Sequence, residues 1–177
     1  MKQQDVVMGT VYLLIAQIAF VFSGYMVHIG LGRLLGPSEY GSYSVILYII
    51  TLFNMILSTG LPQAASKFIS EDRIQSGAVF KTSLIFSSYL GLIIFWTIFV
   101  SAEWIASVFK DPELSPYIKV ASLMIPFYNI FTIVLGYYNG LRYYKIQSYL
   151  LLSYHIIKPV MIFSFVCMGF SLWGAIL

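Results

Sequence analysis

Five long apolar segments limit what this chain can fold into. They cover residues 6–31, 40–60, 78–101, 117–138 and 148–170, and each is about as long as the roughly 20 residues that cross a bilayer as a helix. The chain has 177 residues, of which 59% are hydrophobic and 10% charged. One soluble core cannot bury that much apolar surface. The sequence therefore predicts an all-α integral membrane protein. We expect the lipid bilayer to be one of its partners.

The two ends of the chain refine this prediction. The first apolar segment is longer than the core of about 7–15 residues in a secretory signal, and no small-residue cleavage site follows it. We therefore expect residues 6–31 to remain as a transmembrane helix rather than a cleaved signal. A sixth apolar segment opens at Leu172 and reaches Leu177. We expect residues 1–177 to form one N-terminal six-helix bundle of a longer protein, with five complete spans and the start of a sixth.

Lysine and arginine residues between the segments predict the orientation in the membrane. A cytoplasmic N-terminus places these cations inside: Lys2, Lys67, Arg73, Lys81, Arg142 and Lys145. It leaves Arg33, Lys110 and Lys119 outside. Six against three predicts a multi-pass protein of the cell membrane with its N-terminus in the cytoplasm. The net charge of +3 is small and dispersed, so we expect no nucleic-acid partner.

Proline and glycine mark the expected connections. Residues 32–41, GRLLGPSEYG, predict a turn at the membrane surface, because Pro37 cannot continue a helix. Pro62 opens residues 61–80, which we expect to be either a short amphipathic helix on the cytoplasmic surface or an ordinary polar loop. Pro126 predicts a kink in the fourth span.

Two glycines near the end of the fourth span, Gly136 and Gly140, have the spacing that allows two helices to approach closely. They lie beside turn signals, so we interpret them as helix termination.

Lys158 is the candidate functional residue of the predicted spans. It lies ten residues after Ser148, hence about 15 Å into a hydrocarbon core about 30 Å thick. An unpaired cation at that depth costs roughly 2.5–3.5 kcal/mol on insertion scales. A water-filled cavity, a carboxylate or an anionic substrate would offset this cost, and the predicted spans contain no Asp or Glu. The alternative is a shifted span that leaves Lys158 nearer the interface.

Tyr154 and His155 precede Lys158 by four and three residues, so the three should lie on one side of a helix. Pro159 should kink that helix and free the carbonyl of His155. We predict a substrate-binding site of Lys158, His155 and Tyr154. Arg33 is a further candidate, although its place at a helix end makes interfacial snorkelling the cheaper explanation.

Enzyme chemistry has no support in the sequence. A phosphate-cradling glycine loop, a zinc-protease helix and a nucleophile elbow are all absent from it. His28 and His155 lie in different segments, so we expect no metal site. We predict a transporter without catalytic residues or cofactor, and leave the coupling ion open.

Four stretches resemble a known family. In chain order they are GRLLGPSEYGSYSV, STGLPQAASKFISE, FKDPELSPYIKVASLMIPF and YYNGLRYYKIQSY. Together they resemble the polysaccharide biosynthesis or oligosaccharide flippase family, a branch of the multidrug/oligosaccharidyl-lipid/polysaccharide exporter superfamily. The resemblance implies twelve to fourteen helices in two bundles, with the C-terminal half of the same transporter as partner.

The same resemblance implies an activity. It implies alternating access that moves a lipid-linked oligosaccharide from the cytoplasmic to the outer leaflet. Such a lipid carries phosphate or pyrophosphate, for which Lys158 would be the counter-charge. A cation-coupled multidrug antiporter of the same superfamily would favour a buried Asp or Glu in these helices. A membrane-embedded glycosyltransferase would need a larger external loop than residues 101–116. A non-transporting membrane scaffold remains a further alternative.

Overall fold

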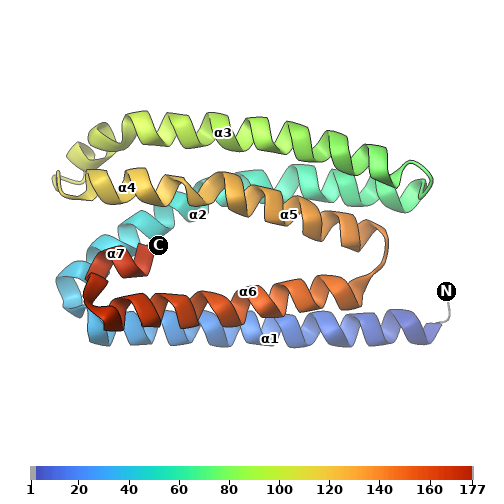
Figure 1. Cartoon of the computed structure of the whole chain (residues 1–177), viewed down its shortest axis with the longest axis horizontal. Coiled ribbons are helices and arrows are strands. Elements are labelled where there is room, and N and C mark those ends of the chain that lie inside the picture. Colours follow the sequence, from blue (N-terminus) through green and yellow to red (C-terminus); the bar gives the residue numbers. More distant parts are fainter. Residues whose placement is uncertain (1–2, 177) are drawn as a thin grey trace.

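The computed structural model describes residues 3–176, which are almost entirely helical (Figure 1). The helices are α1 (Gln3–Leu34), α2 (Gly36–Glu71), α3 (Ser76–Val108), α4 (Leu114–Ser122), α5 (Met124–Gly140), α6 (Tyr144–Phe165), the π-helical turn η1 (Val166–Phe170) and α7 (Ser171–Ile176). Within the described residues, five helical stretches are long and apolar enough to cross a membrane. The prediction of an all-α membrane protein is therefore confirmed. Lys2, one of the cations in the orientation argument, lies outside the described residues.

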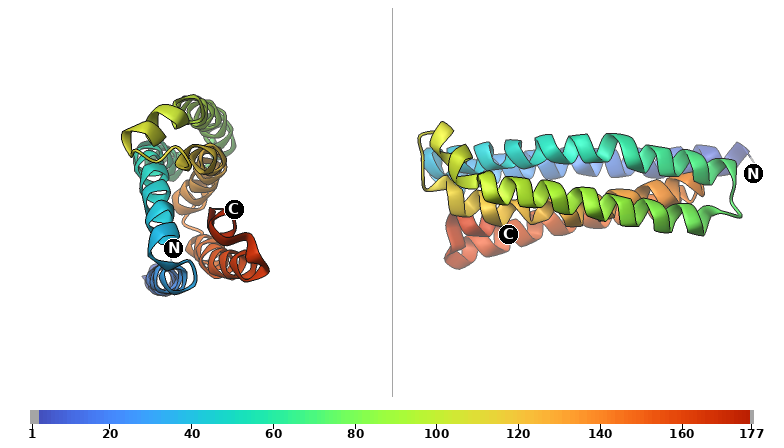
Figure 2. Two further views of the ribbon diagram at one scale, coloured as in Figure 1. Left: turned by 90° about the vertical axis from the view of Figure 1, so that its left-hand side faces the viewer. Right: turned by 90° about the horizontal axis from the view of Figure 1, so that it is seen from above.

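The helices form two layers joined by a crossing helix (Figures 1 and 2). One layer holds α1 and α6 side by side, and Ser148 of α6 donates a hydrogen bond of 3.0 Å to the Tyr12 carbonyl of α1. The other layer holds α3, α4 and α5, where the Asn129 amide donates to the Ser87 carbonyl at 2.7 Å. The long α2 runs diagonally from the first layer to the second.

The bundle has two ends, which we name by a residue at each. The Asp72 end holds the turns at residues 72–75 and 141–143. The Pro112 end holds the turns at Leu35, residues 109–113 and the reversal before α7.

The turn expected at residues 32–41 lies in the right place but is far shorter than predicted. α1 ends at Leu34 and α2 begins at Gly36, so Leu35 alone separates the two helices. Gly36 has φ +75°, which only glycine adopts readily. Pro37 occupies the first turn of α2, where the missing N–H costs nothing. The proline therefore starts a helix here.

The expectation for residues 61–80 is wrong. α2 continues through Pro62 as far as Glu71, so this stretch is neither a separate surface helix nor a loop. Pro62 is buried, and its missing N–H leaves the Ser58 carbonyl without its usual helical partner. The connection to α3 is confined to residues 72–75.

Packing against α5 explains why α2 persists beyond its proline. A Cβ on Gly136 would lie 2.5 Å from the Pro62 carbonyl oxygen, and one on Gly140 would lie 2.7 Å from that of Ser66. Side chains at these two positions would not fit. Gly136 and Gly140 therefore bring two backbones together, and their interpretation as mere helix termination is corrected.

The later helices have some of the breaks predicted from the sequence. The fourth span is interrupted at Leu123, three residues before Pro126, which is where the kink was expected. The kink expected at Pro159 does not interrupt α6, which runs through this buried proline as one helix from Tyr144 to Phe165. Gly169 (φ +93°) and Ser171 (φ +48°) then reverse the chain. α7 folds back beside α6, as the expected start of a further helix at residue 172 requires (Figure 1).

Candidate functional site

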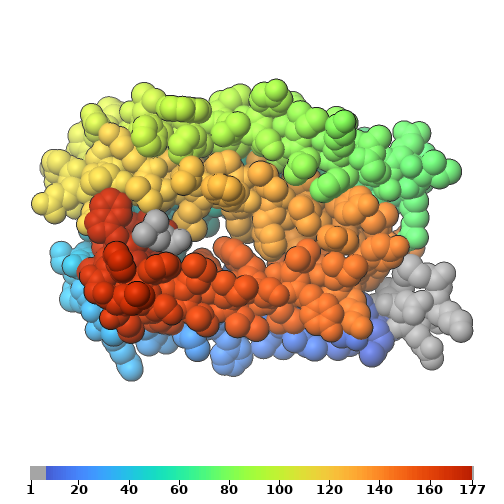
Figure 3. Space-filling view, viewed as in Figure 1, coloured from blue at the N-terminus to red at the C-terminus, as the bar shows by residue number. Residues whose placement is uncertain are grey.

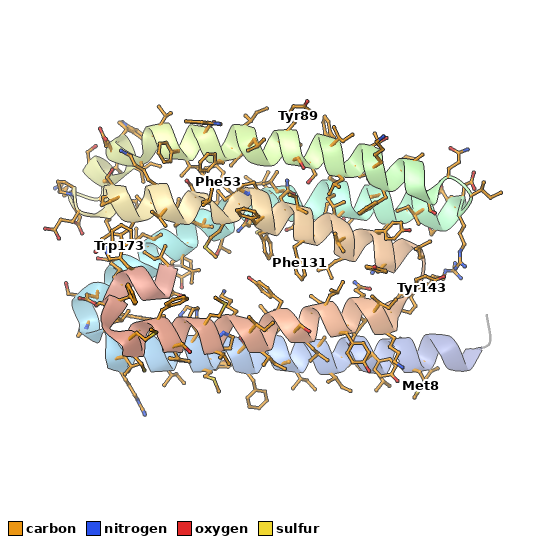
Figure 4. All side chains as sticks on the ribbon, viewed as in Figure 1. Met8, Phe53, Tyr89, Phe131, Tyr143 and Trp173 are labelled. Carbon is orange, nitrogen blue, oxygen red and sulfur yellow. The ribbon has the colours of Figure 1, made fainter. Side chains whose placement is uncertain are left out.

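A hollow separates α5 from α6 in the middle of the bundle, and it is visible in the space-filling view (Figure 3). Aromatic side chains reach into it from both helices. Phe131 of α5 points toward α6 (Figure 4) and stacks on Tyr154 with ring centroids 5.3 Å apart. Tyr128 of α5 lies 6.2 Å from the same tyrosine ring. We call Tyr128, Phe131 and Tyr154 the aromatic cluster.

Lys158 lies one helical turn beyond Tyr154 on the same face of α6. Its Nζ is 6.0 Å from the centroid of the Tyr154 ring, a cation–π contact. The side chain is partly buried. No carboxylate lies within ion-pair distance of it among the described residues. The cation therefore has an aromatic neighbour and no counter-charge in this part of the chain.

The position of Lys158 along α6 is central. It follows Tyr144 by 14 residues and precedes Gly169 by 11. At 1.5 Å per residue these separations are about 21 Å and about 17 Å. A cation so far from both helix ends has little opportunity to reach the headgroup region through its own stem.

His155 is close to Tyr154 but faces a different helix. Its ring lies 5.2 Å from that of Tyr154 in an edge-to-face arrangement. It also lies 5.2 Å from the Phe20 ring of α1. Tyr154 and Lys158 therefore face the hollow, whereas His155 lies between Tyr154 and α1. Of the three residues expected on one polar face of α6, Tyr154 and Lys158 share that face and His155 does not.

Arg33 stands apart from the other predicted site residues. It lies exposed in the last turn of α1, at the Pro112 end. Gly30 lies against Phe163 of α6. Since Arg33 is three residues further along, it lies about two helical turns beyond Lys158. The structure does not bring these two cations together.

A second aromatic group, which was not predicted from the sequence, lies between α1 and α2. His28 Nδ1 and the Tyr40 hydroxyl are 3.0 Å apart, and Tyr43 lies 6.2 Å from Tyr40 between ring centroids. The three-residue spacing of Tyr40 and Tyr43 on one helix face was the available signal.

The sequence analysis also missed a polar cavity at the Asp72 end. Its volume is about 610 Å³, within the range of small-molecule sites. It is lined by Ser58, Pro62, Gln63, Ser66, Lys67, Ser70, Thr132, Leu135, Gly136, Asn139, Arg142, Tyr144 and Gln147. We call this cavity the polar pocket. The signal was the polar run after Pro62, which continues along one face of α2 rather than along a surface connection.

The chemistry of these groups is that of binding. Among the described residues, no cluster of three or more His, Cys, Asp or Glu side chains could hold a metal ion. Cations, hydroxyl groups, amides and aromatic rings can hold an anionic ligand that carries hydroxyl groups, by charge, hydrogen bonds and stacking.

Comparison with known proteins gives one match. The family described as "Polysaccharide biosynthesis protein" matches residues 6–177. No curated protein and no solved structure matches the chain. The family match covers nearly the entire chain.

Proposed function

The chain belongs to the polysaccharide biosynthesis protein family, and we propose that it is the first bundle of a transporter for lipid-linked oligosaccharides. In this proposal it carries its cargo from the cytoplasmic to the outer leaflet of the cell membrane, with its N-terminus in the cytoplasm. It acts by alternating access together with the C-terminal half of the same transporter, and it performs no covalent chemistry.

The single observation that carries this proposal is the position and surroundings of Lys158. It lies partly buried at mid-helix beside an open hollow, with no carboxylate within ion-pair distance in the described part of the chain. An unpaired cation in a bilayer core costs roughly 2.5–3.5 kcal/mol. A phosphate or pyrophosphate group on the cargo would supply the missing negative charge. Such a group is what a lipid-linked saccharide carries.

The aromatic cluster supports the same assignment. Phe131 and Tyr154 meet across the hollow, so a ligand beside Lys158 would contact rings from two helices. In this arrangement α6 contributes the cation of Lys158, and α5 contributes aromatic rings. A ligand that bridges the two layers would therefore be held by charge on one side and by ring contacts on the other.

Two alternatives remain for comparison. A cation-coupled multidrug antiporter of the same superfamily would use a carboxylate to bind Na⁺ or H⁺ in these helices. The carboxylate of Glu39 instead accepts a hydrogen bond from Ser171 at the Pro112 end, away from Lys158. A non-transporting scaffold would have no use for an uncompensated cation at mid-helix.

The test is to neutralise Lys158 in cells that make the complete gene product. Lys158→Met keeps the length of the side chain and removes its charge, and Lys158→Arg retains the charge. Lys81→Met is the matched control, because Lys81 is an exposed cation at the start of α3. We expect Lys158→Met to lower polymer export by about tenfold or more, since it removes a charge-assisted contact, while Lys81→Met exports normally. Normal export by Lys158→Met at equal membrane abundance would refute the proposal.

A further inference from the structure

The polar pocket carries an inference of its own. We propose that it binds the phosphate or pyrophosphate group of the cargo lipid before that group reaches Lys158. The cargo identity rests on the proposed function, whereas the anion site rests on the pocket alone. Its two cations, Lys67 and Arg142, come from α2 and from the turn between α5 and α6, so they lie on different walls.

The charge balance of the pocket favours an anion. None of its lining residues is acidic. Glu71 lies 4.0 Å from the Lys67 Nζ, but both side chains are largely exposed, so the pair is weak and Lys67 stays available. Arg73 donates to the Leu141 carbonyl at 3.1 Å, which places a further guanidinium beside Arg142. The pocket and its neighbour Arg73 therefore supply three cations, and the nearby carboxylates of Glu71 and Asp72 at the end of α2 are exposed to solvent.

Uncharged polar groups line the remaining wall. The Ser66 hydroxyl donates to Asn139 Oδ1 at 3.2 Å across the α2–α5 contact. Gln147 Oε1 is buried and has no hydrogen-bond partner within the part of the chain that is described. A buried acceptor without a partner is unusual, and a sugar hydroxyl would satisfy it. With the amide turned over, the same side chain would donate to a phosphate oxygen.

Arg142 has a strained backbone conformation at the end of α5. Arg142 has φ +62°, and the N–H of Tyr143 bonds to the Tyr138 carbonyl at 2.9 Å. The N–H of Arg142 bonds to the Asn139 carbonyl at 2.9 Å, which completes a Schellman cap. Glycine is the usual residue at this position, because other side chains are strained there. Arg142 is strained at this position, and what it adds over glycine is a charged side chain.

The pocket leads toward Lys158. Gln147, Tyr154 and Lys158 follow one another at intervals of seven and four residues, which places them on one face of α6. Phe131 and Leu135 of α5 lie on the opposing face at an interval of four. A head group would travel about 17 Å from the level of Gln147 to that of Lys158. The aromatic cluster lies between the two positions.

The chain contains a matched control for Arg142. Lys110, at the end of α3, has φ +56° and caps its helix in the same way, through Lys110 N–H to Ser107 and Asp111 N–H to Ala106. It lies at the Pro112 end and does not line the polar pocket. Arg142→Gly and Lys110→Gly therefore remove one cation each and relieve the same backbone strain.

The experiment measures binding of inorganic pyrophosphate to the purified full chain in nanodiscs by calorimetry. We expect Lys110→Gly to bind like the unaltered chain and Arg142→Gly to bind about tenfold more weakly or worse. Both variants should melt no lower than the unaltered chain, because glycine suits their backbones. Undiminished binding by Arg142→Gly, or no binding by any form, would overturn the inference.

A second arm identifies the source of the phosphate. Farnesyl pyrophosphate, which carries a short lipid tail, should bind at least about tenfold more tightly than inorganic pyrophosphate if the pocket receives a lipid head group. Equal affinity would overturn the head-group assignment and point to a soluble phosphate compound.

Lys158→Met separates this inference from the proposed function. We expect the pyrophosphate site at the polar pocket to survive this change, because Lys158 does not line the pocket, while binding at Lys158 and export are lost. Loss of pyrophosphate binding in Lys158→Met but not in Arg142→Gly would move the anion site to Lys158 and overturn the inference. Retained binding with normal export would instead refute only the proposed function.

Discussion

Helix α5 packs against its two neighbours in opposite ways. Toward α2 it presents Gly136 and Gly140, and the two backbones approach so closely that a Cβ would not fit. Toward α6 it presents Tyr128 and Phe131, and a hollow remains between the two helices (Figures 3 and 4). The first contact is fixed by backbone and leaves no room for adjustment. The second is made by aromatic rings, which can change their packing without a clash between backbones.

The strongest way to break this comparison is to fill the tight contact. Gly136→Leu places a side chain where the Pro62 carbonyl lies 2.5 Å from the new Cβ, and a backbone cannot yield as a flexible side chain does. We expect a loss of stability of about 3 kcal/mol or more, at or above the upper end of overpacking effects. Thermal or SDS-induced unfolding in detergent measures it.

Gly24→Leu is the control for that variant. Gly24 lies in α1, and nothing lies within 4 Å of a Cβ built there. We expect this substitution to leave stability within about 0.5 kcal/mol of the unaltered chain. If Gly136→Leu unfolded no more easily than Gly24→Leu, the close contact of α2 and α5 would be incorrect.

The α5–α6 contact should show the opposite pattern, with a small effect on stability and a larger effect on export. Phe131→Ala removes the ring that stacks on Tyr154, and we expect a stability loss of only about 0.5–1.5 kcal/mol because the ring borders a hollow. Export by the complete gene product should nevertheless fall severalfold. Tyr89→Ala is the matched control, since Tyr89 points outward from α3 (Figure 4). Equal export by the two variants would remove the aromatic cluster from the transport path.

These two contacts also show how far sequence reasoning reaches in this chain. Hydrophobic length predicted the helices, because every bilayer-spanning segment must satisfy its backbone internally. The breaks at Leu123 and before Ser171 were also predictable, from Pro126 and from the end of an apolar run. The prediction at Pro62 was wrong, since a local rule for proline does not include the support that α5 gives to α2. That support comes from residues more than 70 positions away.

The candidate site was predictable only in part. Lys158 and Tyr154 could be found because a mid-span cation is costly and four-residue spacing defines a helix face. The partners of Tyr154 on α5 could not be found, because periodicity gives the face of a helix without naming the helix opposite. The polar pocket was hidden for the same reason, since Lys67 and Arg142 are far apart in sequence. Arg33 was suggested by its charge alone, and the structure leaves it apart from the others.

The smallest expected effect on stability comes from the contacts that join the two layers at the Pro112 end. There the Ser171 hydroxyl donates to the Glu39 carboxylate, and Trp173 of α7 lies 4.3 Å from Tyr117 of α4 between ring centroids (Figure 4). These contacts join the α6–α7 reversal to α2 and to the other layer, so the hollow is bridged at this end. At the Asp72 end the polar pocket lies between α2, α5 and α6.

Glu39→Ala removes the acceptor of that bridge, and we expect a stability loss of about 0.5–1.5 kcal/mol, the usual net value of one hydrogen bond. Glu39→Gln keeps an acceptor oxygen and should lose less. Glu113→Ala, an exposed carboxylate at the same end, should change stability by less than about 0.5 kcal/mol. Unfolding in detergent ranks the three variants. If Glu39→Ala matched Glu113→Ala, the hydrogen bond would contribute nothing, and the apolar packing of α7, including Trp173 on Tyr117, would join the layers at this end. If the order holds, the Glu39–Ser171 bond contributes to holding the reversal before α7 against α2 at this end.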